Sequence, residues 1–495
     1  MRLIPLILVA CTAPPLPAPT QSPSASPSPS PSPSPPPSPS PPPSPLTISI
    51  TEHPHLDTWT VTWTLASASA SASASEAPAI IFDRRIPSNR HETWRLADGL
   101  VWDVDPSGDY EVIRAADGAA RSVFTATFPS DTREVGRAPS LNVRFTDGSR
   151  LLFTAQVGAY GFSCAPRCLR LDRDAPRRWH FHTSPGRTLR VLDHAATGEL
   201  VWDEPAGDVR GTYLYAGSIP PTRHERVTLV ADPGLPAWLT ADTARLLPEL
   251  FAFHGDATGV ALDFVPLVLA SYASPTRRDD ALRGKTLPGL IHVEAIGSAW
   301  VRASPARRAR LFEVLAHEAF HLWNAQLARR GGDKRDEWLS EGSAVYVAGL
   351  ALVDAGLLSP RAHEERILAA ASDCIATLRG PLHAEAADAS YYACGELVHF
   401  LVDRALAGRG GVLGVWAAVI AHARASGSYS TADFLREVER RGTAAPGGAA
   451  VAADVRRILE EGLGADPVAL VARMLDDARL PTRRAGGGRR LVRRR

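Results

Sequence analysis

The chain has 495 residues, and its 54 Lys and Arg residues balance 53 Asp and Glu residues, which leaves a formal net charge of +1. Proteins that bind nucleic acids normally carry a clear basic excess, so we expect no nucleic acid among the partners of this chain. No apolar run in the sequence approaches the ~18–20 residues of a membrane-spanning helix, which argues against an integral membrane transporter or channel.

The first residues have the pattern of an export signal. The basic Arg2 precedes an apolar run over 3–10, and Cys11 stands where this run ends. The segment Leu8–Cys11 resembles a bacterial lipobox, in which the cysteine becomes the new N-terminus and receives acyl chains. We therefore predict a lipoprotein signal peptide over 1–11, with Cys11 as the lipidation site and a lipid anchor in the bacterial cell envelope, periplasmic or surface-exposed. The alternative is an ordinary secretory signal that contains a cysteine by chance.

Residues 12–45 consist almost entirely of Pro, Ser, Ala and Thr. Such a composition cannot bury a core and favours the extended polyproline II conformation. At ~3.1 Å per residue, a linker of this length reaches on the order of 100 Å. We predict a Pro/Ser-rich linker that holds a folded body away from a membrane. The alternative is passive low-complexity sequence.

The part from Leu46 to Asp232 is predicted to be a β-sandwich domain. The segment Thr58–Thr64 alternates polar and apolar residues with a period of two and uses residues that favour strands. The segment Ser122–Phe128 repeats this pattern. Turn clusters such as Asp105–Asp109 separate the short strands, as is typical of sandwiches.

The character of the sequence changes after Pro236. We predict a helix from Thr240 to about His254, then strands over 260–272 and 289–294. Beyond the second strand the sequence reads as helices. The expected fold class is therefore α+β and multidomain, with the β-sandwich followed by a domain over 233–482 that has a small sheet and a mainly helical C-terminal half.

Two Ser-Pro pairs mark the starts of helices. Ser304 and Ser359 each place a capping side chain before a proline at the first helical position. The basic tail over 483–495 is predicted to be disordered, since terminal charge runs are usually solvated. Contact of this tail with anionic lipid or a cell-wall polymer is the alternative.

Four cysteines remain after Cys11, and an even number in an exported chain suggests disulfides. Cys164 and Cys168 are placed to close a small loop, and Cys374 and Cys394 are placed to connect two neighbouring helices. A zinc site of four cysteines is the rival interpretation. Neither pair has the two-residue spacing of zinc knuckles, which argues against it.

The segment with the clearest chemistry is His317–Asn324, which reads HEAFHLWN within the helix that begins after Ser304. His317 and His321 are one helical turn apart, so both rings project from one face and can bind one zinc ion. Glu318 lies beside the first ligand and can take a proton from the attacking water, whose pKa a zinc ion lowers.

A third ligand is expected on the following helix. The segment Trp338–Gly342 reads WLSEG, and Glu341 is placed to reach the same metal as His317 and His321. Two histidines and one glutamate form a known catalytic zinc set, so we predict one Zn²⁺ per chain. The alternative is a pair of exposed helical histidines with an ion-paired glutamate.

These two segments resemble the gluzincin metallopeptidases, most closely the glycyl aminopeptidase family and more broadly the aminopeptidase N family. A third segment, Ser390–Leu397 (SYYACGEL), is similar to a tyrosine-x-x-glycine motif ahead of a helix. The resemblance implies a thermolysin-like zinc-peptidase domain, and it implies that Tyr392 hydrogen-bonds the tetrahedral oxyanion. Tyr391 is the rival for this role, and a merely packed Tyr392 is the alternative.

The chain departs from this family in two ways. Members often carry a PDZ domain, for which little chain remains. In addition, Pro288–His292 looks like the family's Gly-Leu-Glu-His strand with Ile291 at the glutamate position. The resemblance assigns that glutamate to the α-amine of the substrate, and an isoleucine would leave the ammonium without a partner. Glu294 is three residues away and faces the opposite side of the strand.

We still expect an extended substrate to pair with the backbone of this edge strand, at Gly289, Leu290 and Ile291. The predicted function is an exported zinc metallopeptidase that acts on peptides or unfolded proteins, with exopeptidase and endopeptidase action both open. The alternative is a catalytically inactive, zinc-binding surface lipoprotein that binds peptides. Ile291 supports the alternative, and the intact Glu318 counts against it.

Overall fold

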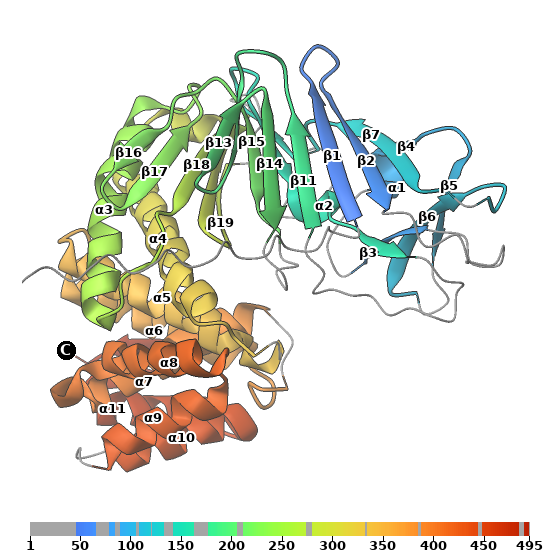
Figure 1. The fold of residues 1–495 in the computed structure, drawn as a ribbon. Helices are drawn as coiled ribbons and strands as arrows, with labels where there is room; N and C mark the ends of the chain where they lie inside the picture. Colours follow the sequence, from blue (N-terminus) through green and yellow to red (C-terminus); the bar gives the residue numbers. More distant parts are fainter. Residues whose placement is uncertain are drawn as a thin grey trace, which may run out of the picture. The chain divides into compact units, whose positions relative to one another are not determined.

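The structure is a computed structural model (Figure 1), and it describes residues 46–65, 79–84, 90–104, 108–119, 121–132, 142–162, 177–204, 211–273, 280–331, 334–384, 388–443, 448–484 and 490–494. The predicted signal peptide and linker lie outside the described residues, as do Cys11, Cys164 and Cys168. Strands occupy the first half of the described chain and helices the second (Figure 1), which confirms the α+β class.

The strand-rich half forms three sheets in the described part of the chain. In β1 (Leu46–His53) and β2 (Thr58–Leu65) every second side chain is buried, as the alternation in the sequence predicts. Trp59 and Trp63 of β2 are completely buried in the core of this half. The six-stranded sheet has the order β14 (Glu199–Glu204), β11 (Arg177–His182), β1, β2, β7 (Val123–Pro129) and β4 (Arg95–Leu96).

The other two sheets are shorter. The four-stranded sheet has the order β10 (Tyr160–Phe162), β3 (Ala79–Asp83), β6 (Tyr110–Ala115) and β5 (Leu100–Val104). The five-stranded sheet has the order β13 (His194–Thr197), β12 (Thr188–Val191), β15 (Tyr213–Gly217), β9 (Arg150–Phe153) and β8 (Val143–Arg144). Two one-turn helices, α1 (Arg90–Thr93) and α2 (Thr154–Val157), interrupt the strands.

The strands β9 and β15 of the five-stranded sheet are buried on both faces. Leu152 of β9 and Leu214 of β15 join the core of the strand-rich half. Their neighbours Phe153 and Tyr213 point the other way, into a second core that also contains Leu290. This sheet therefore connects the strand-rich half to the part of the chain that follows it.

A further five-stranded sheet begins before the predicted domain boundary at residue 232. Its order is β16 (Thr222–His224), β17 (Val227–Ala231), β18 (Leu267–Ala273), β20 (Leu290–Ile296) and β19 (Ala281–Leu287). The strands β17, β18 and β20 run parallel, and the edge strand β19 is antiparallel to β20. The prediction is wrong on two counts: β18 starts later than residue 260, and β19 was not foreseen.

Helices make up most of the remaining chain. Ser304 and Ser359 accept hydrogen bonds from the backbone N–H groups of Arg307 and Ala362, so both predicted caps are confirmed. The first helix begins earlier than predicted, at Ala237. The helices are α3 (Ala237–Thr258), α4 (Pro305–His321), α5 (Glu337–Asp354), α6 (Pro360–Thr377), α7 (Asp388–Ala405), α8 (Gly411–Ser426), α9 (Thr431–Gly442), α10 (Gly448–Glu460) and α11 (Pro467–Asp477).

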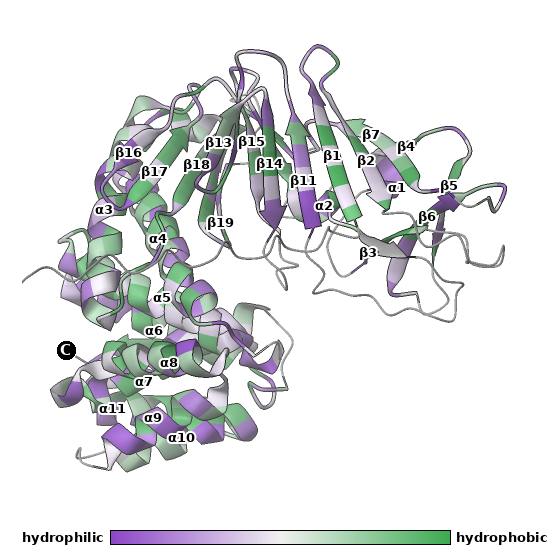
Figure 2. Cartoon of the chain, in the orientation of Figure 1, coloured by the Kyte–Doolittle hydropathy of each residue, from purple (hydrophilic) through white to green (hydrophobic). Residues whose placement is uncertain are grey.

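The outer helices are amphipathic. Hydrophobic and hydrophilic stretches alternate along α9 and α10 (Figure 2), and Phe434 and Val438 of α9 lie completely buried in the helical core. Within the described part of the chain, no helix is long and apolar enough to cross a membrane.

The C-terminal segment is more ordered than predicted. β21 (Thr482–Arg484) pairs with β22 (Leu491–Arg493) in a small antiparallel sheet. Leu491 is 2% exposed, and Arg493 pairs with Glu364 of α6 at 2.6 Å. The prediction of disorder is wrong for these residues, because their aliphatic and charged groups both find partners on the helices.

Candidate metal centre

Two histidines meet at the C-terminal end of α4. The helix places His317 and His321 on one face, with their Nε2 atoms 3.1 Å apart. His321 is the last residue of α4, and the chain continues directly into a π-helical turn over Leu322–Leu327. Such turns are rare and are often found at functional sites.

The helix α5 brings a carboxylate to the same point. Oε2 of Glu341 lies 3.3 Å from His317 Nε2 and 3.4 Å from His321 Nε2. The ligand atoms of all three residues lie within 4.8 Å of one another. The structure thus brings together the three residues that the sequence predicts as metal ligands.

The three groups fit a metal ion. Oε2 of Glu341 is buried and accepts no hydrogen bond from the described residues, so a buried anionic oxygen faces two imidazole nitrogens. Two histidines and one glutamate are the ligands of a catalytic zinc site that keeps a position open. His317, His321 and Glu341 would hold the ion.

The charges of these groups are strongly coupled. Burial opposes the charged form of His321, but the carboxylate of Glu341 outweighs it and raises the pKa of His321 to about 9. Burial also opposes ionisation of Glu341, yet the two histidines hold the pKa of that carboxyl far below its usual range. Glu341 thus favours the charged form of His321, and the histidines favour the charged form of Glu341.

Glu318 lies between α4 and the edge strand β19. Its side chain is buried, and Thr286 Oγ1 donates a hydrogen bond to Glu318 Oε2 at 2.8 Å. Gly284 faces the same carboxylate so closely that a Cβ atom there would lie 2.5 Å from Cγ and Oε1 of Glu318. The absence of a side chain at Gly284 is what admits Glu318 to this position.

The neighbouring residue of β19 points away from Glu318. Because strand residues alternate, Lys285 lies on the opposite face from Gly284 and Thr286. Its Nζ lies 4.7 Å from the centre of the Phe153 ring of β9. Burial lowers the pKa of Lys285 to about 8, although the negative charge of Glu318 acts to raise it.

The two adjacent tyrosines of α7 have different surroundings. Tyr391 is 6% exposed and belongs to the helical core, whereas Tyr392 is 40% exposed. The ring of Tyr392 stacks on the ring of His317 with their centres 5.9 Å apart. Tyr392 therefore lies against the cluster of His317, His321 and Glu341.

A close helix crossing places Tyr392 there. A Cβ atom on Gly342 of α5 would lie 2.3 Å from Cα of Gly395 of α7, so the two backbones touch at a pair of glycines. Gly342 follows Glu341 directly, and Gly395 lies one turn after Tyr392. The crossing therefore brings the part of α5 that carries Glu341 next to the part of α7 that carries Tyr392. Near it, a disulfide joins Cys374 of α6 to Cys394 of α7, the pair predicted from the sequence.

The predicted substrate-binding strand is not at the site. β20 is internal, since it pairs with β18 on one side and β19 on the other. Gly289, Leu290 and Ile291 are therefore not an edge strand, and Leu290 and Ile291 are fully buried in the cores. The prediction was wrong because the edge strand β19 reads as ALRGKTL, whose polar residues and glycine hide its strand character.

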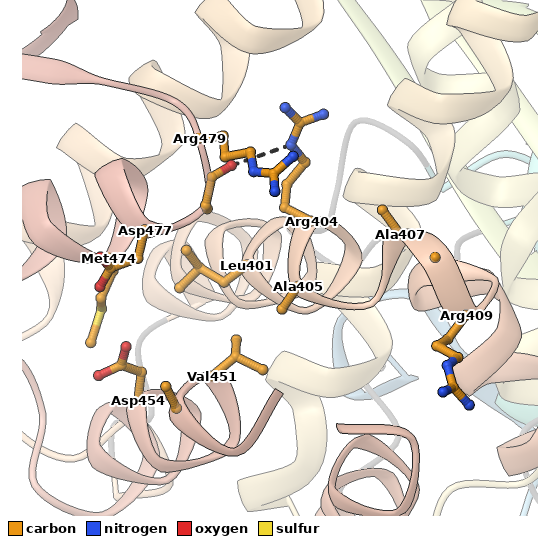
Figure 3. Close-up of a pocket in the computed structure, with 13 residues that line it drawn as sticks. Leu401, Arg404, Ala405, Ala407, Arg409, Val451, Asp454, Met474, Asp477 and Arg479 are labelled. Atoms are coloured by element: carbon orange, nitrogen blue, oxygen red, sulfur yellow. Dashed lines mark hydrogen bonds between the residues drawn. The ribbon is translucent and has the colours of Figure 1, made fainter. Parts of the chain in front are cut away.

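A separate cavity of about 630 Å³ lies between α7, α10 and α11 (Figure 3), and no predicted site residue lines it in the described chain. Its two carboxylates, Asp454 and Asp477, both pair with Arg473. Its arginines lie at the exposed rim, as Arg404 and Arg479 do. In the described chain, no histidine lines this cavity, so it has no group of side chains like His317, His321 and Glu341.

Sequence comparisons do not place the chain: no family model matches it, and no curated protein sequence matches it. Solved structures do resemble it. An aminopeptidase N family protein from Idiomarina loihiensis superposes with a TM-score of 0.62 at 12% identity, over 86% of this chain and 78% of that one. Yeast LTA4 hydrolase superposes with a TM-score of 0.51 in complex with bestatin, at 12% identity, over 85% of this chain and 68% of the hydrolase.

The native yeast LTA4 hydrolase gives the same TM-score of 0.51 at 11% identity, over 84% of this chain and 67% of that one. These likenesses extend over most of the described chain and include both its strand-rich and its helical halves. The chain therefore has the multidomain α+β fold that the aminopeptidase N family protein and LTA4 hydrolase share.

Proposed function

We propose that this protein is a zinc-dependent metallopeptidase that hydrolyses peptide bonds. The observation that carries the proposal is the convergence of His317, His321 and Glu341, with the buried Glu318 beside them. The fold supports it, because similar structures carry the names of an aminopeptidase family protein and a hydrolase. Within that fold, the HEAFHLWN, WLSEG and SYYACGEL segments make the glycyl aminopeptidase family the closest resemblance.

Each residue has a role that follows from its position. A zinc ion held by His317, His321 and Glu341 would act as a Lewis acid and lower the pKa of a water molecule. Glu318 accepts a proton from the attacking water at its carboxylate and delivers that proton to the leaving amine. The Tyr392 hydroxyl donates a hydrogen bond to the oxyanion that develops on the peptide carbonyl.

The edge strand bears on the choice between exopeptidase and endopeptidase. The two residues of β19 that face Glu318 are Gly284 and Thr286, and β19 contains no Asp or Glu. This strand therefore offers no carboxylate to an α-ammonium group, which favours cleavage that does not require a free N-terminus. Ile291 no longer supports an inactive binding protein, since that side chain is part of the core.

The substrates we propose are peptides or unfolded proteins outside the cytoplasm, and the anchor is the lipidated Cys11. Labelling cells with a radioactive fatty acid tests the anchor. Label should be incorporated into the wild-type chain and not into Cys11→Ser. Equal labelling of both would contradict lipidation at this residue.

The test of the function is Glu318→Gln. We expect this variant to lose about 10²–10⁴-fold of the peptidase activity, because it removes the proton acceptor, while it keeps one zinc ion per chain. The measurement is mass spectrometry of a diverse peptide mixture that includes N-acetylated peptides, together with elemental analysis of bound zinc.

Glu313→Gln is the matched control, since Glu313 lies five residues earlier on α4 and pairs with Arg310 and Arg366 rather than with the cluster of His317, His321 and Glu341. Activity that persists in Glu318→Gln would contradict the proposed mechanism. Internal cuts or cleavage of N-acetylated peptides would indicate an endopeptidase. A zinc-loaded wild-type protein that cleaves nothing would instead favour the binding lipoprotein.

A further inference from the structure

Asn324 occupies a buried position between the two ligand-bearing helices. It lies three residues after His321, in the π-helical turn that continues α4, and its exposed fraction is 0%. A fully buried amide must satisfy its oxygen and both of its N–H groups within the protein. The hydrogen-bond partners of Asn324 therefore indicate its role.

The partners of Asn324 determine which way its amide points. Nδ2 lies 2.8 Å from the carbonyl oxygen of Ser340 and 2.8 Å from Oγ of Ser343, both on α5. A carbonyl oxygen only accepts hydrogen bonds, so the amide nitrogen must face Ser340. The amide oxygen Oδ1 then faces Nδ1 of His321, at 3.0 Å.

This orientation fixes the tautomer of His321. An amide oxygen only accepts, so Nδ1 of His321 must carry a hydrogen atom. In the neutral ring, the lone pair is then on Nε2, the atom that faces His317 and Glu341. The ring is therefore held in the form that can donate electrons to a metal ion at the meeting point of the ligands.

The same amide also holds the third ligand. Ser340 directly precedes Glu341, and its carbonyl oxygen accepts from Asn324 and from Oγ of Ser343 at 3.0 Å. One buried side chain thus touches a ligand on α4 and the backbone beside a ligand on α5. Oriented partners of this kind tune the affinity of metal sites.

The π-helical turn is itself fixed on several sides. The Tyr429 hydroxyl donates to the carbonyl oxygen of Asn324, and Trp323 Nε1 donates to the carbonyl oxygen of Val260 at 2.7 Å. Gln326 Oε1 accepts from the backbone N–H of Gly289 at 2.7 Å, at the turn between β19 and β20. The position of Asn324 is therefore fixed by contacts that involve none of His317, His321 and Glu341.

We propose that Asn324 is a positioning residue that fixes the tautomer of His321 and couples α4 to α5, so that the three ligands are preorganised for the metal. The inference rests on the proposed zinc site, and it does not depend on peptide hydrolysis.

The test compares Asn324→Leu with the wild-type full chain. Leucine has a similar volume and provides neither the acceptor for His321 nor the donors for α5. We expect the zinc affinity, measured by competition with a chelating indicator, to fall about 10–100-fold. The visible absorption bands of the Co²⁺-substituted protein should also change, because they report the geometry of the ligands.

Asn142→Leu is the control for loss of a buried amide. Asn142 is also completely buried, and its Oδ1 accepts from the backbone of Phe153 in the strand-rich half. This variant should lower stability and leave zinc affinity and the Co²⁺ spectrum unchanged. A folded Asn324→Leu variant with wild-type zinc affinity and spectrum would overturn the proposal.

If Asn324→Leu does not fold, Ser343→Ala tests whether Asn324 couples α4 to α5. It keeps the partner of His321 and removes one of the two bonds from Asn324 to α5, so zinc affinity should fall by a smaller factor, roughly 3–10-fold. Unchanged affinity in this variant would contradict the coupling. Wild-type protein that binds zinc without hydrolysing peptides would overturn the peptidase and leave this inference intact.

Discussion

At the scale of single residues, the carboxylate of Glu318 is held by two residues of β19 that carry no charge. Thr286 donates a hydrogen bond to it, and Gly284 leaves room for it. A general base contributes to catalysis only when its oxygen is within hydrogen-bond reach of the proton that it takes. In the proposed mechanism, the strand would therefore affect the reaction by holding the carboxylate of Glu318 in position.

Gly284→Ala tests this arrangement. The new Cβ atom would lie 2.5 Å from Cγ and Oε1 of Glu318, so the carboxylate must move and its bond to Thr286 must lengthen. Misplacement by about 1 Å can cost about 10²-fold in rate, so we expect kcat/KM to fall by roughly that factor with zinc content unchanged. Peptide-cleavage kinetics and metal analysis provide the measurement.

The matched control is Gly255→Ala in α3, where the added methyl group has no neighbour closer than 3.7 Å. Full activity in Gly284→Ala would show that the backbone accommodates the methyl group and that the position of Glu318 does not depend on this glycine.

At the scale of elements, the site depends on the crossing of α5 and α7. The two helices approach until Gly342 and Gly395 are in backbone contact, so that a Cβ atom on either glycine would clash with the other helix. The crossing places Glu341 and Tyr392 on the same side as α4. The disulfide between Cys374 and Cys394 fixes the adjoining turn of α7 to α6.

Gly395→Ala should separate these helices. Its Cβ atom would lie 2.6 Å from Cα of Gly342 and 2.6 Å from the carbonyl oxygen of Trp338, both of which are backbone atoms that cannot rotate away. We expect a loss of about 1–3 kcal/mol in the free energy of unfolding, together with weaker zinc binding. Urea denaturation and chelator competition measure the two effects.

Gly380→Ala serves as the comparison, since a Cβ atom there meets nothing within 4 Å and the backbone is not left-handed. This variant should keep the stability and zinc affinity of the wild type. If Gly395→Ala behaved in the same way, close contact of the glycines would not be what positions Glu341 and Tyr392.

At the scale of the whole molecule, the helical core contains histidines that burial keeps neutral. Burial lowers the pKa of His254 to about 3, that of His363 to about 4 and that of His399 to about 4. In the unfolded chain these groups titrate near the usual value of about 6.5. Between about pH 4 and pH 6.5, these histidines therefore bind fewer protons in the folded state than in the unfolded state.

It follows that the contribution of these three histidines to stability is complete above about pH 6.5 and is lost as the pH falls toward about 4. We expect the free energy of unfolding to fall over this range, with a slope that His254→Leu reduces by up to about 1.4 kcal/mol per pH unit. Urea denaturation of metal-free protein at several pH values measures this slope.

The exposed His55 provides the control, because His55→Gln should leave the slope unchanged. An identical acid dependence in His254→Leu and the wild type would show that burial does not keep this histidine neutral.

Local features were predictable from the sequence because they depend on spacing within one element. The period of the α-helix places His317 and His321 on one face, and the serines at 304 and 359 cap their helices through neighbouring backbone groups. The likeness to a known motif also indicated Glu341 and Tyr392. Each of these inferences needs only a few residues of the chain.

Which strand borders the site was decided only by the tertiary structure. Ile291 and its neighbours look like an edge strand in the sequence, but the pairing of β19 on one side and β18 on the other makes them internal. Strand order depends on contacts between distant segments, which no local pattern encodes.

The same distinction between local sequence features and long-range contacts applies to the side chains of the site. The sequence by itself determined the proposed chemistry, because the candidate metal ligands and the candidate general base are identified by residue type and helical period. Only the tertiary structure decided how these groups are held, since the partners of Asn324, Glu318 and Tyr392 come from separate helices and strands. Long-range packing brings such partners together, and it is not visible in the order of the residues.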